Sequence, residues 1–450
     1  MSTTDLTRTP SSGGNRKIWT FSAWLKRAVK SDTNNSRIFS AGAAQTDYTA
    51  WFMGAVDGTD GRLFFQNRVS NSTTELASSR QFRDVNGWYH LVIACDTTQA
   101  TDSNRVKIYV NGVQETLTGA YPAQNVDTFV NHTTEHNIGS ADGAGYTPRY
   151  WAGSMSHVHL VDGSALAPTV FGFTDSTTGE WKIKASPSYT VGTNGFFILK
   201  DGNSVTDQST NTNNFTVSGG TLTKTEDNPS NVFCTINPLL LSISNMTIQS
   251  GNTAKRTQSG SNAWRSEYGT LGASSGKFYY EFKIEQINNS DPNNFWIGIV
   301  DADQMVNTSN NERFYQQSRG YGYHAQSGSQ GNNNSTSSYG ATYTAGDIIG
   351  VALDLDNSKL YFHKNGTYQN SGVPTSGSTG TGAINISSGY TYLPAIAQYY
   401  SDEKWSANFG NGDFNAAGIS SAGTNASGHG IFEYDVPTGY TALCTKGLNL

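Results

Sequence analysis

The chain of 450 residues is poor in charged side chains, in cysteine and in long apolar runs. Charged residues make up only 14% and the net charge is -6, which argues against a nucleic-acid-binding protein, because such a protein needs a basic face. The three cysteines lie far apart without a CxxC motif, so we expect neither a zinc site nor a disulfide framework. The longest apolar stretch, residues 238–243, is too short to span a membrane, and no signal peptide is visible at the N-terminus. These absences predict a protein made in a reducing cytoplasm, with no membrane span.

Glycine and aromatic residues are abundant instead. The chain has 48 glycines, and its 23 Tyr, 21 Phe and 9 Trp supply ample core material, so the low charge does not indicate disorder. Short apolar stretches separated by glycine and asparagine are typical of many strands joined by tight turns. A chain of this length is too long for one compact sandwich and suits two or three domains. We therefore expect a multidomain protein built from strands.

The clearest pattern is GDIIGVALDLDNSKLYFHKNG, at residues 346–366. It predicts a β-hairpin with an apolar first strand, a turn at Asp356-Asn357, and a second strand that ends in Asn365-Gly366, a pair suited to positive φ. With FWIGIVD before it, YLPAIAQYY after it and WSANFGNG as a closing strand, the hairpin resembles a SPRY domain over residues 242–412. The resemblance implies a concanavalin-like β-sandwich used for recognition and seldom for catalysis.

The first third of the chain has its own ordered motifs: WTFSAWLK, WYHLV, VKIYVNG, NIG and WAGSMSHVHLVDGSAL. The first of these alternates apolar and polar residues, as a half-buried strand does. Their order resembles a laminin-G/pentraxin-type domain over residues 1–173, again a concanavalin-like jelly roll. Residues 174–241 are predicted as a β-rich bridging segment that extends the first domain or forms a small sheet, and residues 413–450 as a C-terminal extension. The expected fold class is therefore all-β, with two concanavalin-like antiparallel β-sandwiches in tandem.

Three further segments resemble a group of tailed-phage virion proteins that is common in marine phages. They are TRTPSSGGNRKIWTFSAWLKR near the start, DNPSNVFCTINP in the middle and HGIFEYDVPTGYTALCTKGLNL at the end. Members of this group carry a laminin-G-like module followed by a SPRY-like one. The resemblance implies a component of the virion, with other virion proteins as partners, and leaves its place on the particle open.

The carboxylates and histidines do not form the catalytic patterns that are typical of hydrolases. The hydrolases of this fold carry E-x-D-x-x-E on one strand, a pattern that is absent here, and Asp354 and Asp356 are expected at a strand end and its turn. Glu281 and Glu285 are expected on the solvent side of their strand. His157 and His159 share a predicted strand face without a neighbouring carboxylate, and no GxSxG or phosphate-binding loop occurs. We therefore expect no enzymatic activity, and the alternative is a polysaccharide depolymerase on a jelly-roll scaffold.

Two binding sites are candidates. The segment 319–340 combines aromatic rings with uncharged hydrogen-bonding groups, which suits contact with a glycan. Because a SPRY sheet contains a GYGY-type strand, packing in the core is an equal alternative for the first two tyrosines. A calcium ion is the possible cofactor, at two carboxylates in an Asp-Gly-Thr-Asp-Gly turn, although such sequences are also plain hairpin turns. The candidate ligand contacts are Tyr321, Tyr323, His324, Gln326 and Tyr339, and the candidate calcium ligands are Asp57 and Asp60.

The expected function follows from these resemblances. We expect a non-enzymatic phage virion protein, either a head decoration, a fibre or a tail-associated adhesin, whose partner is a host-surface glycan or receptor. Its termini, Thr4 to Asn15 and Tyr434 to Leu450, are expected to pack against the chain's own domains or against neighbouring copies, because free ends of this composition normally fray. A closed homo-oligomer is expected, with three copies as the leading number.

Overall fold

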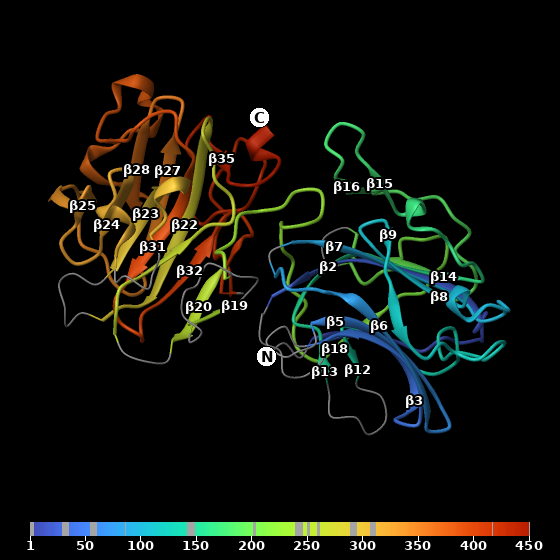
Figure 1. The fold of residues 1–450 in the computed structure, drawn as a ribbon. Coiled ribbons are helices and arrows are strands. Elements are labelled where there is room, and N and C mark those ends of the chain that lie inside the picture. Colours follow the sequence, from blue (N-terminus) through green and yellow to red (C-terminus); the bar gives the residue numbers. More distant parts are fainter. Residues whose placement is uncertain are drawn as a thin grey trace. The chain divides into compact units, whose positions relative to one another are not determined.

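The computed structural model describes residues 4–28, 36–54, 61–85, 87–141, 149–200, 204–238, 246–249, 253–258, 262–288, 295–306, 312–415 and 417–449. The fold is all-β, as predicted, and the chain divides into two compact units, Met1–Lys224 and Thr225–Leu450 (Figure 1). Two units therefore replace the four expected segments. Among the described residues, no helix is long and apolar enough to cross a membrane.

The first unit is a sandwich of two main antiparallel sheets. The six-stranded sheet has the order β17 (Phe196–Ile198), β14 (Gly153–Asp162), β2 (Ile18–Arg27), β7 (Tyr89–Asp96), β8 (Val106–Val110) and β9 (Val113–Gln114). The eight-stranded sheet has the order β10 (Leu117–Gly119), β6 (Ser72–Gln81), β5 (Arg62–Val69), β4 (Asp47–Met53), β3 (Ser36–Ala44), β11 (His136–Ile138), β1 (Asp5–Arg8) and β18 (Thr216–Ser218). Two short ribbons complete the unit: β12 (Ser140–Ala141) with β13 (Arg149–Tyr150), and β15 (Gly172–Thr174) with β16 (Trp181–Ile183).

Aromatic side chains fill the space between these two sheets. Trp51 on β4 stacks on Phe39 of β3, with ring centroids 4.3 Å apart, and on Trp19 of β2 in the opposite sheet, at 5.6 Å. All three rings are fully buried. Side chains alternate between the two faces of a sheet along each strand. The cross-strand row of residues next to the row of Phe39 and Trp51 therefore faces away from the core. That outward row contains Asn137, Ser40, Ala50, Gln66 and Glu75, and the inward row contains Ile138, Phe39, Trp51, Phe65 and Leu76.

Most of the expected bridging segment belongs to the first unit. Strand β17 extends the six-stranded sheet beyond β14, and β18 covers the edge strand β1 of the other sheet. Phe196 and Phe215 are buried in the same core as Trp51. The first alternative, an extension of the first domain, is therefore the one observed. The remainder of the segment joins the second unit, where Phe233 forms a bridge to Cys444.

The second unit is also a sandwich, with the main sheet path β19 (Met246–Gln249), β20 (Ala254–Gln258), β32 (Lys404–Asn408), β22 (Lys277–Gln286), β27 (Ile348–Asp354), β28 (Lys359–Lys364) and β29 (Thr367–Tyr368). Strand β30 (Ile384–Asn385) joins β28, and β35 (Thr441–Ala442) joins β22. The facing sheet is β21 (Arg265–Tyr268), β31 (Tyr392–Gln398), β23 (Phe295–Asp301), β24 (Gly320–His324), β25 (Ser329–Asn332) and β26 (Ser335–Ser338). A short two-stranded ribbon follows β32 along the chain and consists of β33 (Asp413–Phe414) and β34 (Ala417–Gly418).

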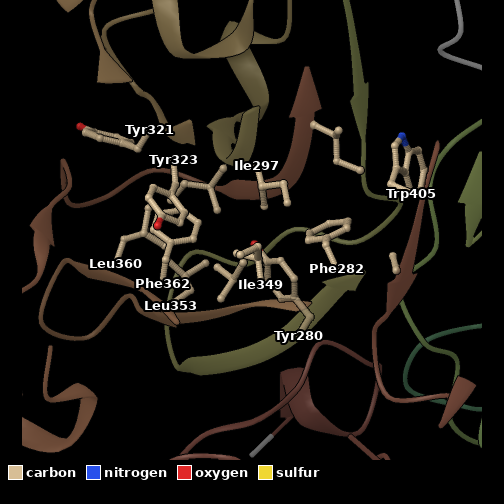
Figure 2. Close-up of a cluster of buried hydrophobic side chains, with 14 of the residues drawn as sticks. Tyr280, Phe282, Ile297, Tyr321, Tyr323, Ile349, Leu353, Leu360, Phe362 and Trp405 are labelled. Carbon is tan, nitrogen blue, oxygen red and sulfur yellow. The ribbon is translucent and has the colours of Figure 1, made fainter. Parts of the chain in front are cut away.

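The predicted hairpin is confirmed as β27 and β28, which pair from Ile349 with Lys364 to Asp354 with Lys359. Asp354 is fully buried and shapes the turn, since its carboxylate accepts hydrogen bonds from the backbone N–H and the side-chain amide of Asn357. Inward side chains of both sheets meet in one core, for example Phe362 of β28 and Tyr323 of β24, with centroids 5.3 Å apart (Figure 2).

Both described chain ends pack against their own units, as expected. At the N-terminal end, β1 lies between β11 and β18, and Leu6 is buried in the first core. At the C-terminal end, β35 runs parallel to β22, while Phe432 and Tyr440 are buried against Tyr279 and Tyr361. The C-terminal extension is therefore part of the second sandwich.

Glu281 holds this C-terminal segment in place through hydrogen bonds. The expectation that Glu281 faces solvent is therefore wrong. Glu281 is fully buried on β22, whereas Glu285 is exposed. One carboxylate oxygen accepts hydrogen bonds from the Tyr434 N–H and the Tyr279 hydroxyl, both at 2.9 Å, and the other accepts from the Glu433 N–H at 3.0 Å. Burial raises the pKa of Glu281 to about 7, while these hydrogen bonds oppose the rise.

A histidine continues the same network. The Gly366 N–H donates to Nδ1 of His363, so in the neutral ring the proton lies on Nε2. Nε2 lies 2.6 Å from the Tyr279 hydroxyl, which in turn donates to Glu281. Burial lowers the pKa of His363 to about 3, so the ring is neutral at physiological pH. Gly350 leaves the room for this ring, because a Cβ there would lie 1.9 Å from Nε2.

The boundary at residue 224 is testable with two fragments. Fragment 1–173 lacks β17 and β18, which leaves two sheet edges uncovered and removes Phe196 and Phe215 from the core. We expect fragment 1–224 to unfold in one cooperative calorimetric transition and fragment 1–173 to aggregate. Cooperative unfolding of the shorter fragment at the same temperature would contradict this boundary.

The role of Glu281 is testable with a matched pair of variants on β22. Glu281→Ala leaves two part-buried backbone N–H groups without this acceptor, so we expect the free energy of unfolding to fall by about 3 kcal/mol. Limited proteolysis should then cleave within residues 432–449. Glu285→Ala, four residues further along the same strand and exposed, removes the acceptor of the Ser406 hydroxyl, so it should lower the free energy of unfolding by at most about 1 kcal/mol and leave the cleavage pattern unchanged. Equal effects of the two substitutions would refute the assignment.

Candidate functional site

The three candidate tyrosines of the segment 319–340 lie in the core of the second unit. Tyr321, Tyr323 and Tyr339 are 5%, 0% and 6% exposed, and all three belong to the main hydrophobic cluster, where Figure 2 labels the first two. The Tyr323 hydroxyl donates to the carbonyl of Ala341. The packing alternative is therefore correct, because a glycan could reach these rings only if the sandwich opened.

The other two candidates do not join the tyrosines. His324 follows Tyr323 on β24 and so faces the opposite side of the sheet, where its ring stacks on Trp296 at 4.4 Å. It is 1% exposed, and its Nδ1 lies 2.7 Å from the Ser327 hydroxyl. Gln326 is half-buried in the turn that follows. The three tyrosines therefore lie in the core, His324 lies on the opposite side of the sheet and Gln326 lies in a turn, so the five residues form no common surface.

The candidate calcium ligands Asp57 and Asp60 lie outside the described residues, so the calcium site stays a prediction. In the part of the chain that the structure describes, no three His, Cys, Asp or Glu side chains gather as metal ligands would. His157 and His159 do not share a regular strand face, since β14 has a bulge between Ser156 and His159 and His157 has a φ of 49°.

Buried histidines of the first unit are instead held by ring contacts and hydrogen bonds. The His90 ring stacks between Trp24 and Trp181, and the Trp181 indole N–H donates to His90 Nδ1 at 3.0 Å. His90 Nε2 is 2.9 Å from the Ser22 hydroxyl. Burial lowers the pKa of His90 to about 3, and the charge of His157 lowers it further. His159 is similarly buried, against Phe197 and the Tyr189 hydroxyl.

A pocket that sequence reasoning missed lies on the outer side of the eight-stranded sheet. Most of the residues that line it are buried, with Asn137 2% and Tyr48 8% exposed, so little of its lining is open to solvent. Its floor is made of small side chains on β3, β4 and β12, and its polar groups come from β3, β4 and β11. The lining residues are Arg37, Ser40, Ala41, Gly42, Ala44, Tyr48, Ala50, Asn137 and Ala141.

The polar lining of the pocket is mostly fixed by neighbouring strands. The Ser40 hydroxyl donates to the Ser140 carbonyl at 3.0 Å, and the Tyr48 hydroxyl donates to Gln66 Oε1 at 2.9 Å. The Arg37 guanidinium stacks on the Phe52 ring, 3.9 Å from its centroid. The side-chain oxygen of Asn137 is buried without a hydrogen-bond partner. The signal in the sequence was the run of small residues at 41–44, which interrupts an otherwise aromatic strand pair.

The buried histidines of the first unit predict sensitivity to acid. Burial lowers the pKa of His90 to about 3 and of His136 to about 4, and that of His159 well below its usual value. Their folded pKa values lie below the unfolded value near 6.5, so the stability they retain at neutral pH is lost as the pH falls through that value. We expect urea unfolding of fragment 1–224 to show a loss of about 1 kcal/mol for each histidine between pH 7 and pH 5.5.

This measurement uses the first unit because the raised pKa of Glu281 acts in the opposite direction in the second. His90→Gln, which keeps an acceptor for Trp181, should reduce the loss. Stability that does not change over this pH range would contradict neutral burial of these rings.

Two family matches agree with the two units. Residues 2–171 match a family described as the concanavalin A-like lectin/glucanases superfamily, and residues 277–389 match the SPRY domain. Among curated proteins, the E3 ubiquitin-protein ligase RKP of Arabidopsis thaliana is 35% identical over 72 residues. That alignment covers 16% of this chain and 5% of the relative, so the chain matches only a small part of that protein.

Similar solved structures include a SPRY domain and a pentraxin. The SPRY domain of human HERC1 is 18% identical, with a TM-score of 0.28, and the match covers 36% of this chain and 91% of that one. The heptameric SAP-like pentraxin of Limulus polyphemus is 19% identical, with a TM-score of 0.28, and the match covers 36% of this chain and 71% of that one. From the family matches and the two sandwiches, the chain consists of a laminin-G-like domain of the concanavalin type followed by a SPRY domain.

Proposed function

We propose that the chain is a non-enzymatic structural protein of a tailed-phage particle, and that it contacts the host surface. The observation that carries the proposal is the tandem of two β-sandwich domains of types that typically serve binding or adhesion. The phage assignment is supported by the flanking and central sequence segments that resemble virion proteins.

The chemistry of the titratable groups supports a binding role. Glu281, Asp354 and His363 are buried and engaged in hydrogen bonds that hold turns and the C-terminal segment. Glu75, on the same face as the pocket, accepts a hydrogen bond from Gln66. A glycosidase needs two carboxyl groups about 5 to 10 Å apart on either side of the scissile bond. A binding protein needs only a shaped surface with satisfied polar groups.

The proposal includes assembly as a closed homo-oligomer, for which three copies is the leading number. Both described chain ends are held within their own units, so the assembly would form through surfaces of the folded domains. Light scattering of the purified chain would give the number of copies.

The proposed function is testable on particles and on cells. We expect mass spectrometry to find the chain in purified virions of the phage that encodes it, and the purified chain to be retained by host cells and not by cells of a resistant strain. Incubation with host envelopes should release no reducing sugar. Virions without the chain would sink the virion assignment, and sugar release that the purified chain alone produces would favour a depolymerase.

A further inference from the structure

Strand β26 forms one edge of the facing sheet in the second unit and has an open side. It pairs with β25 alone, through a two-residue turn at 333–334. The pair that flanks such a turn is hydrogen-bonded, so Ser335 and Ser337 direct their N–H and C=O groups toward β25. The N–H and C=O groups of Thr336 and Ser338 therefore point away from the sheet. Among the described residues, no backbone group outside the sheet forms a hydrogen bond with them.

This edge lacks the side chains by which proteins usually prevent the pairing of exposed strands. All residues of β26 are exposed, and the segment 325–346 contains no charged residue and no proline. Strand β17, at one edge of the six-stranded sheet in the first unit, is covered instead. There the Asp207 carboxylate accepts from the Phe197 N–H, and the Gln208 N–H donates to the Phe197 carbonyl. Strand β26 is therefore free to accept another strand at its open side.

A second copy of β26 is complementary to this edge. When two copies run antiparallel around a two-fold axis at Ser337, Thr336 of each copy lies opposite Ser338 of the other. The outward N–H and C=O groups of these residues then bond to one another across the axis. A charged side chain near the axis would lie close to its own copy and be repelled, and β26 carries none. Its small hydroxyl side chains also form favourable cross-strand pairs.

We propose that two copies of the chain associate by antiparallel pairing of β26 with β26, which joins their facing sheets into one. A four-residue strand buries far less than the area of about 1,200 to 2,000 Å² that stable complexes bury, so this association is weak in solution. A contact with two-fold symmetry joins copies in pairs and cannot close a ring of three. It is therefore a contact separate from the closed oligomer of the proposed function, and it links one such oligomer to the next.

Cysteine cross-linking of the full chain tests the register of this pairing. Ser337 lies opposite its own copy in a non-hydrogen-bonded pair, in which the Cα atoms are about 4.5 Å apart and within the range of a disulfide. We expect Ser337→Cys, oxidised mildly with glutathione disulfide, to give a two-chain band on a non-reducing denaturing gel. An alkylating agent is present during denaturation, because Cys95, Cys234 and Cys444 are free and buried in the folded chain.

Ser335→Cys is the matched control, because Ser335 is exposed on the same strand and its side chain lies on the same side of the sheet. In the proposed pairing the two copies of residue 335 are about 13 Å apart, which is beyond the range of a disulfide. We therefore expect Ser335→Cys to cross-link at least about tenfold more slowly than Ser337→Cys. Equal rates for the two variants, or no cross-linking of Ser337→Cys, would overturn the inference.

Ser338→Pro tests the hydrogen bonds of the open side. It removes an outward N–H and no hydrogen bond to β25, so the melting temperature should stay close to that of the unchanged chain. In sedimentation velocity, the mass of the unchanged chain should rise with concentration, and Ser338→Pro should weaken this association at least about tenfold. Equal association of the two chains would contradict the pairing. Weaker association of Ser338→Pro without cross-linking of Ser337→Cys would show that β26 pairs with a different strand, and it would overturn the two-fold contact.

Discussion

Burial of aromatic rows between paired antiparallel sheets is the constraint on which both domains depend. Phe39, Trp51 and Phe65 form such a row in the first domain, and the hydrogen-bonded register of β3, β4 and β5 fixes all three on the inner side. A shift of one residue would turn these rings to solvent, so the register is strongly specified. The same register places Ser40, Ala50 and Asn137 on the outer side. The pocket is therefore a direct consequence of how the core is packed.

Two polar side chains that are buried on the outer faces of the sheets, Glu281 and His90, are tolerated because they are hydrogen-bonded. Glu281 accepts hydrogen bonds from the backbone of the C-terminal segment, and His90 accepts from an indole N–H between two tryptophan rings. Each of these groups joins a later segment of the chain to a sheet, so it stabilises an ordered end or ribbon without a disulfide. Cys95, Cys234 and Cys444 are free and buried, so no disulfide contributes to this stabilisation among the residues that the structure describes.

The sequence was sufficient for the fold class, the order of the two domains and the hairpin of β27 and β28, because alternation and turn residues act locally. It was insufficient where a residue's environment depends on distant segments. Glu281 was expected in solvent, and only the return of residues 432–442 buries it. For Tyr321 and Tyr323, the sequence favoured packing in the core and contact with a ligand equally, since a strand pattern does not show which face of a sheet is covered. The pocket was not predicted, because its small residues at 40–50 meet Asn137 and Ala141 from strands that are distant in sequence.

The most direct test of the account is an electron-microscopy reconstruction of the virion of the phage that encodes this chain. If the chain is a binding protein on the particle, we expect density for both β-sandwiches at the outer surface. The side of the eight-stranded sheet that carries Ser40, Tyr48 and Asn137 should then face away from the particle. Density for the chain only inside the particle, or that side of the sheet covered by another virion protein, would contradict the account.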